Sequence, residues 1–138
     1  MALYTAEARV TGGRTDGHGR TPGGELDVRI RMPKELGGDG SGTNPEQLFA
    51  VGYAACFEAA LDLAAPGRTL DTTIDARVSL LPADGGALKL GVELDVSLPG
   101  TDDAAELVRA AHRICPYSHA IRGNVGVAFT VNGVPLAV

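Results

Sequence analysis

A long apolar segment in the first half of the chain constrains the fold more than any other feature. It runs from Leu48 to Ala65, and the acidic residues Glu58 and Asp62 are its only charged members. A helix that is apolar nearly all round has to be covered, either in a core or in a subunit interface. We therefore expect this segment to be a buried helix.

Both ends of this helix carry recognisable signals. Asn44 is a good N-cap, Pro45 suits the first helical position, and Gln47 stands three residues after the cap, as in a capping box. Pro66 and Gly67 follow the apolar segment and end the helix. The sequence therefore predicts one helix over the whole span between them.

The rest of the chain alternates between strand patterns and turn signals. Leu26–Met32 alternates apolar and charged residues strictly, as a half-buried strand does. Strands are predicted at Leu3–Val10, Leu26–Met32, Thr72–Leu81, Leu88–Leu98 and Val125–Val131, glycine-rich loops at Thr11–Gly24 and Gly37–Gly42, a hairpin turn at Asp84–Gly86, a second helix at Asp102–Ile114 broken by Pro116, and a last turn at Asn132–Gly133.

The order of these elements indicates the fold class. Strands come in groups and do not alternate with helices, so we expect an α+β fold with antiparallel sheet rather than a parallel α/β fold. A chain of 138 residues is long enough for one core, so we expect a single domain over residues 1–138.

Charge and composition exclude several function classes. The net charge of −5 argues against nucleic acid and anionic membranes as partners, because both attract basic surfaces. The chain has no unbroken run of 18 apolar residues, so we expect no membrane span. Met1–Glu7 lacks the pattern of a signal peptide. With only two cysteines the chain is no disulfide scaffold, so we expect a cytoplasmic protein whose thiols rest reduced.

The two cysteines stand in different settings, which suggests redox chemistry. Cys56 lies inside the apolar helix and is expected to be the sheltered thiol, whereas Cys115 precedes Pro116 at a helix break and is expected to be the mobile one. A protein that attacks with one sulfur and resolves with another needs such a pair. The alternative is structural, since free cysteine is among the most buried residue types.

A reactive thiol also needs a nearby cation, because an ordinary cysteine titrates at about 8.5. Arg14, Arg20 and, less favourably, His18 are the candidates in the preceding glycine-rich loop. Glu46 precedes Cys56 by nearly three helical turns, or about 15 Å of rise, so it can only orient such an arginine.

Other site chemistries find no support. His112 and His119 flank Cys115 at ligand-like spacing, but no second pair of cysteines or histidines accompanies them. Neither a dinucleotide-binding glycine motif, a P-loop nor a serine nucleophile elbow is present. We expect no metal and no cofactor.

Several motifs, taken together, resemble those of a known family. They are Leu3–Ala6, Gly12-Gly13-Arg14, Leu26–Val28, Glu35–Gly38, Gly42–Ala50, Gly52–Phe57, Cys115-Pro116-Tyr117-Ser118 and Arg122–Val125. With them the chain resembles, almost end to end, the organic hydroperoxide resistance (Ohr) proteins of the OsmC/Ohr family. The resemblance implies an intertwined homodimer in which antiparallel sheets wrap around central helices.

The resemblance also implies a thiol peroxidase with named roles. Cys56 matches the cysteine that attacks the peroxide and becomes a sulfenic acid, and Cys115 matches the one that condenses with it to an intramolecular disulfide. Arg14 matches the catalytic arginine and Glu46 the carboxylate that salt-bridges it, with Arg20 as the alternative contact of the thiolate. A dithiol of the lipoamide type, such as a lipoylated protein, would reduce the disulfide. The apolar helix around Cys56 favours organic hydroperoxides over hydrogen peroxide.

Two other function classes stay open from the residues alone. In the first, the chain is a ligand-binding or structural dimer with an inert Cys56, which predicts a thiol without a depressed pKa. In the second, it is a redox sensor that signals through the same disulfide, although no DNA-binding motif or basic patch supports this.

Overall fold

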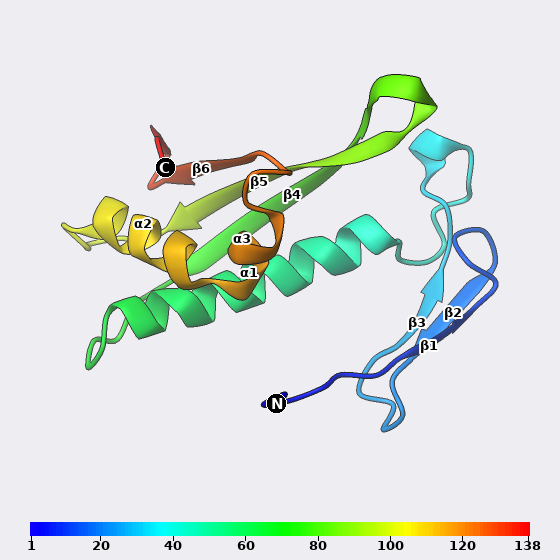
Figure 1. Cartoon of the computed structure of the whole chain (residues 1–138), viewed down its shortest axis with the longest axis horizontal. Coiled ribbons are helices and arrows are strands. Elements are labelled where there is room, and N and C mark those ends of the chain that lie inside the picture. Colours follow the sequence, from blue (N-terminus) through cyan, green and yellow to red (C-terminus); the bar gives the residue numbers. More distant parts are fainter. The chain divides into compact units, whose positions relative to one another are not determined.

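The computed structural model describes residues 1–138, which form two compact units, residues 1–48 and residues 49–138 (Figure 1). Unit 1 contains a small sheet and the first turn of the long helix, and unit 2 contains a larger sheet, the rest of the long helix and two further α-helices. The α+β class is confirmed. The single domain over 1–138 stays a prediction.

Unit 1 is built on a three-stranded antiparallel sheet of β1 (Arg9–Thr11), β2 (Gly17–Arg20) and β3 (Asp27–Ile30), in that order. β2 lies inside the segment predicted to be a loop, so that prediction is wrong. Glycine has a low strand propensity, but Gly17 and Gly19 lie directly against Ile30. A Cβ on Gly17 would stand 2.9 Å from the Ile30 Cβ. Close packing therefore overrides propensity here.

A β-bridge joins the start of the long helix to this sheet. After the short 3₁₀ helix η1 (Lys34–Leu36), Thr43 N–H donates to the Arg29 carbonyl and Arg31 N–H donates to the Thr43 carbonyl, both at 2.8 Å. These two bonds fix the chain one residue before the helix cap.

The long helix, α1 (Pro45–Ala64), begins as predicted. The Asn44 side-chain oxygen accepts a hydrogen bond from Gln47 N–H at 2.9 Å, which satisfies one free donor of the first turn. The Gln47 side chain accepts from the Thr43 hydroxyl at 2.8 Å, in place of the reciprocal bond of a capping box.

Unit 2 contains a four-stranded sheet in the order β4-β5-β6-β7. Its strands are β4 (Thr73–Pro82), β5 (Leu88–Ser97), β6 (Val127–Val131) and β7 (Val134–Leu136). The predicted hairpin of β4 and β5 is confirmed, with a single turn of 3₁₀ helix, η2 (Asp84–Gly86), between its strands.

One strand pair contradicts the antiparallel expectation, because β5 and β6 run parallel. Parallel neighbours need a crossover connection, and here α2 (Ala104–Ile114) and α3 (Pro116–Ile121) supply it. The sequence pattern predicted the first of these helices up to the break at Pro116, but neither α3 nor the direction in which β6 returns.

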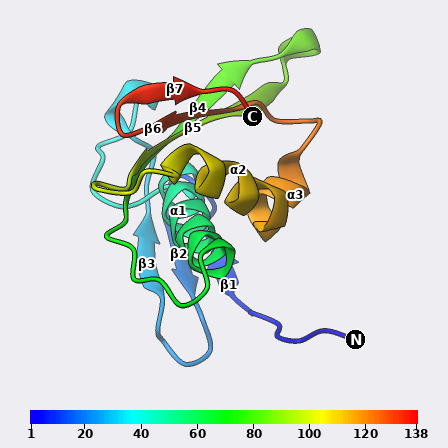
Figure 2. The ribbon, with the colours of Figure 1, turned by 90° about the vertical axis from the view of Figure 1, so that its left-hand side faces the viewer.

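The helices of unit 2 lie on one side of this sheet (Figure 2). Leu94 and Leu98 from the sheet and Val108 from α2 are fully buried in the resulting core. Each such side chain contributes roughly 1.5–3 kcal/mol through burial. This packing fixes α1, α2 and α3 with respect to one another.

Within one chain, α1 is covered on one face only. Tyr53, Phe57 and Leu61 are buried, whereas Val51 is 71% and Leu63 is 75% exposed. The exposed apolar stripe on α1 consists of Val51, Ala55, Ala59 and Leu63, each one turn after the last. The expectation of a helix buried all round is thus met on one side.

By length and composition alone, α1 could also cross a membrane, and a core helix of a soluble protein passes the same test. A spanning helix would carry Glu58 and Asp62 into the bilayer, where carboxylates are costly. Its packed face in unit 2 is the feature of a core helix.

We expect Asn44→Ala to lower the free energy of unfolding by about 1 kcal/mol, because the Gln47 N–H loses its acceptor. Urea denaturation followed by circular dichroism measures this loss. Asn44→Asp keeps an acceptor at the cap and should unfold close to the wild-type midpoint. An equal loss in both variants would show that the lost acceptor is not the cause.

Candidate active site

The structure brings the two cysteines together, although they are 59 positions apart in the chain. Cys56 lies on α1 and Cys115 lies between α2 and α3, and their Sγ atoms are 3.8 Å apart. Both are free thiols. A disulfide bond is about 2.05 Å long, so the two sulfurs need to approach by roughly 1.8 Å to bond.

The exposure of the two thiols is the reverse of the expectation. Cys115 is 0% exposed, whereas Cys56 is partly exposed. The break at Pro116 does not loosen the chain, because proline suits the first position of a helix and α3 begins there. Cys115 N–H donates to the Ala111 carbonyl at 2.8 Å, and the Cys115 carbonyl accepts from His119 N–H at 2.9 Å. Cys115 is therefore held by both helices.

Burial raises the pKa of the Cys56 thiol above its ordinary value. The backbone N–H of Tyr117 acts in the opposite direction, and the neighbouring Cys115 raises the pKa further. No cationic side chain is among these influences. Within unit 2, Cys56 thus lacks the positive charge that would favour its thiolate.

Arg14 lies in the turn that joins β1 and β2. Gly12 shapes this turn with a φ of 77°, and a Cβ at Gly12 would stand 1.9 Å from the Asp16 carbonyl oxygen. Only glycine fits at such a position. The Gly-Gly-Arg motif thus has a local structural reason.

Arg14 and Glu46 form a bidentate ion pair in unit 1. The Arg14 Nη2 is 2.7 Å from Glu46 Oε1, and its Nη1 is 3.1 Å from Oε2. Hydrogen bonds from Arg14 hold the pKa of Glu46 below its ordinary value, so the carboxylate is charged at neutral pH. The contact that the family resemblance implies is present, and the catalytic roles of both residues stay predictions.

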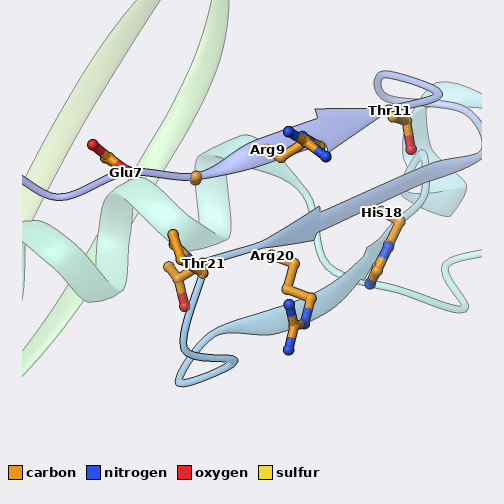
Figure 3. Close-up of a pocket in the computed structure, with 8 residues that line it drawn as sticks. Glu7, Arg9, Thr11, His18, Arg20 and Thr21 are labelled. Atoms are coloured by element: carbon orange, nitrogen blue, oxygen red, sulfur yellow. The ribbon is translucent and has the colours of Figure 1, made fainter.

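The other candidate cations lie elsewhere in unit 1. On β2, His18 hydrogen-bonds to Asp27, and the Arg20 Nε is 3.5 Å from the same carboxylate. His18 and Arg20 line a cavity of about 470 Å³ together with Arg9 and Thr11 of β1 (Figure 3). No thiol lines this cavity, and neither does Arg14 or Glu46. The two arginines of the predicted loop therefore have different carboxylate partners.

Aromatic rings gather beside the two cysteines. The chain has three phenylalanines and three tyrosines, and five of these six belong to one cluster. Its members are Phe49, Tyr53, Phe57, Tyr117 and Phe129, with ring centroids 5.2–6.4 Å apart. Gly52 lets Tyr117 lie against α1, since a Cβ there would stand 2.7 Å from the tyrosine oxygen.

A hydrogen-bond chain joins α1, α2 and α3, and none of its members was assigned a role from the sequence. The Ser118 Oγ is 2.6 Å from the Tyr53 hydroxyl and 2.9 Å from His112 Nδ1. The positions of Ser118, at the end of the Cys-Pro-Tyr-Ser motif, and of His112, one turn before Cys115, were the available signals. The structure contains no group of three or more residues suited to hold a metal.

Comparison with known proteins places these features in a family. The family described as OsmC-like protein matches residues 38–130. The organic hydroperoxide resistance protein OhrB of Bacillus subtilis is 49% identical and covers 92% of this chain and 96% of its own. The organic hydroperoxide resistance protein of Xanthomonas axonopodis pv. citri is 46% identical, with 94% of each chain covered.

A solved structure agrees with the sequence relatives. The organic hydroperoxide resistance protein OsmC from Legionella pneumophila has a TM-score of 0.89 to this chain at 48% identity, and the match covers 95% of this chain and 98% of that one. The fold, the paired thiols and the arginine–glutamate pair thus occur in a chain that belongs to the OsmC/Ohr family, with organic hydroperoxide resistance proteins among its relatives.

Proposed function

We propose that this protein is a cysteine-based peroxidase that reduces organic hydroperoxides to alcohols. The observation that carries the proposal is the 3.8 Å contact between the Cys56 and Cys115 sulfurs. The names of the relatives, organic hydroperoxide resistance proteins, support the substrate class.

In the first step, the Cys56 thiolate attacks the distal peroxide oxygen. The O–O bond breaks, the departing alkoxide takes up a proton and leaves as the alcohol, and the sulfur becomes a sulfenic acid. The partial exposure of Cys56 supports this role, because the attacking thiol has to meet a substrate from solvent.

In the second step, the Cys115 sulfur attacks the sulfenic sulfur. The S–S bond forms, the S–O bond breaks, and the hydroxyl leaves as water with the proton of Cys115. The two electrons that reduced the peroxide have then come from two thiols. A dithiol of the lipoamide type, such as a lipoylated protein, returns them by exchange with the disulfide.

Arg14 is the cation that we propose for the Cys56 thiolate. Because burial raises the pKa of Cys56, the attack at neutral pH requires a compensating positive charge. The bidentate pair with Glu46 gives Arg14 a fixed planar orientation, which suits it to bind a sulfur and a peroxide oxygen together. Arg20 is the less favoured candidate, because it lies outside the Gly-Gly-Arg motif.

The surroundings of Cys56 favour an organic substrate. Tyr117, whose backbone N–H acts on the Cys56 sulfur, is 37% exposed, and its ring centroid is 5.8 Å from that of the partly buried Phe49. Such rings gain free energy by covering an alkyl or aryl group and gain nothing comparable from hydrogen peroxide.

A second copy of the chain is the partner that we propose for the exposed apolar stripe on α1. Contiguous apolar surface on a helix is usually covered in the working assembly. We further propose a cytoplasmic location, where thiols rest reduced and a disulfide can be transient, and expect neither nucleic acid nor membrane as partner.

We expect Cys56→Ser to abolish the reduction of cumene hydroperoxide. Cys115→Ser should still reduce one equivalent and then stop at the sulfenic acid, which mass spectrometry detects after dimedone trapping. Stopped-flow kinetics in single turnover and dihydrolipoamide-driven turnover measure the two effects. An unchanged rate in the Cys56 variant would contradict the proposal, and wild-type single turnover without dihydrolipoamide turnover would contradict only the reductant class.

We expect the loss of Arg14 to move the titration of Cys56 to higher pH. In a Cys115→Ser background, alkylation by iodoacetamide rises with pH as the Cys56 thiolate forms. Arg14→Met should slow this reaction at pH 7 by at least ~tenfold, because the thiolate loses its cation. Arg20→Met is the matched control and should leave the profile in place. If neither variant changes it, the structural interpretation of Cys56 gains support.

We expect Ala59→Glu to convert a dimer into monomers, because it places a carboxylate in the middle of the exposed apolar stripe on α1. Sedimentation velocity measures the molecular mass. Ala87→Glu makes the same change at an exposed position near the hairpin turn and should leave the assembly intact. A dimer that tolerates Ala59→Glu would show that this stripe is not the interface.

A further inference from the structure

The hydrogen-bond chain Tyr53–Ser118–His112 is the most buried polar feature of unit 2. Tyr53 and Ser118 are both 0% exposed, and the Ser118 hydroxyl lies within hydrogen-bond distance of both neighbours, 2.6 Å from Tyr53 and 2.9 Å from His112 Nδ1. Buried polar groups cost free energy unless they are paired, so a complete chain of this kind resists rearrangement. The two chemical steps described above make no use of it.

The direction of the hydrogen bonds follows from the partners available. The Tyr53 hydroxyl has Ser118 as its only side-chain partner, so Tyr53 donates its proton to the serine oxygen. Ser118 then donates to His112 Nδ1, which accepts in the neutral imidazole. Burial, and to a smaller degree the charge of Arg122, lower the pKa of His112 and keep the ring neutral. The Tyr53 and Ser118 hydroxyls thereby each donate to a partner.

The chain connects all three helices around the sulfur pair. Tyr53 lies on α1 three residues before Cys56, His112 lies on α2 three residues before Cys115, and Ser118 lies on α3 three residues after it. Arg122 also links α2 to the end of α3, because its guanidinium donates a hydrogen bond to the His112 carbonyl. The hydroxyl of Ser118 is the point at which the three helices meet through polar contacts.

We propose that the Tyr53–Ser118–His112 chain positions Cys115 for its attack on oxidised Cys56, with Ser118 as the central positioning residue. This inference rests on the proposed peroxidase function. The sulfurs start 3.8 Å apart and have to come within bonding distance with the attacking sulfur in line with the departing oxygen. Aromatic contacts keep the helices close but tolerate sliding, whereas hydrogen bonds are directional.

The role is confined to the second step. Cys56 attacks the peroxide with its own sulfur, and Cys115 enters the first step only as a smaller influence, after burial, on the pKa of Cys56. When Cys115 attacks, its proton leaves with the hydroxyl of the sulfenic acid as water, and the S–S bond replaces the S–O bond. The chain exchanges no atom or electron in this step and only holds the geometry.

The test is Ser118→Ala in single-turnover stopped-flow with cumene hydroperoxide. We expect the rate of sulfenic acid formation to stay unchanged and the rate of disulfide formation to fall by roughly tenfold to a hundredfold, the usual cost of small misplacement. Dimedone trapping and mass spectrometry should find a longer-lived sulfenic acid and more overoxidation of Cys56 at excess peroxide.

Two histidine variants separate positioning from a general loss of packing. In His112→Asn the side-chain oxygen can take the place of Nδ1 and accept from Ser118, whereas in His112→Gln the amide lies nearer to the place of Nε2. We expect disulfide formation near the wild-type rate in His112→Asn and slowed in His112→Gln. Val108→Ala, a buried change on the same helix without polar atoms, should lower stability and leave the rate of disulfide formation unchanged.

The outcomes distinguish the two proposals. If the wild-type protein consumes no hydroperoxide through Cys56, the proposed function is wrong. If the wild type reacts but Ser118→Ala forms its disulfide at the wild-type rate, only the positioning role is wrong. Equal slowing in His112→Asn, His112→Gln and Val108→Ala would likewise reject positioning in favour of packing alone.

Discussion

The conformational restriction that Pro116 places on Cys115 is the constraint on which the paired thiols depend. A residue before proline is pushed out of helical dihedrals, and Cys115 accordingly has φ −67° and ψ 125°. The chain therefore leaves α2 at Cys115 and starts α3 at once. This change of direction goes with a fully buried Cys115 sulfur that lies 3.8 Å from the sulfur of Cys56 on α1. If position 115 had helical dihedrals, α2 would continue in its own direction. The contact between the two sulfurs would then not be set by a bend of the chain.

Burial brings the thiols together at an electrostatic cost. The same packing that holds Cys115 raises the pKa of Cys56 and so opposes the thiolate that reacts with peroxides. A cation with a fixed direction offsets this cost better than a mobile one, because less conformational entropy is lost when it binds the anion. We propose Arg14 as this cation, because its bidentate pair with Glu46 fixes the direction of its guanidinium. The pKa of such a thiol therefore depends on two opposed effects: burial raises it, and a nearby cation lowers it.

The features that could be predicted from the sequence are those fixed by local chemistry. Asn44 and Pro66 bound a helix whose ends agree with the structure, and the alternating strands of the hairpin pair as expected. The failures have non-local causes. β2 exists because Gly17 and Gly19 pack against Ile30, and β5 pairs in parallel with β6 because two helices return the chain to the same end. The family resemblance named the cysteines, Arg14 and Glu46, but the relative burial of the two thiols depends on how α3 packs, which no residue pattern displays.

The surroundings of the thiols combine two kinds of interaction with different physical effects. The aromatic cluster supplies burial free energy without strict direction, and its members hold α1, α3 and β6 together. The Tyr53–Ser118–His112 chain supplies direction, since its members lose their partners if one helix slides by a fraction of a residue. In the proposed cycle the two sulfurs bond and separate repeatedly, and we expect both interactions to contribute. Apolar packing tolerates a small movement of the sulfurs, and the hydrogen-bond chain returns them to the same starting geometry.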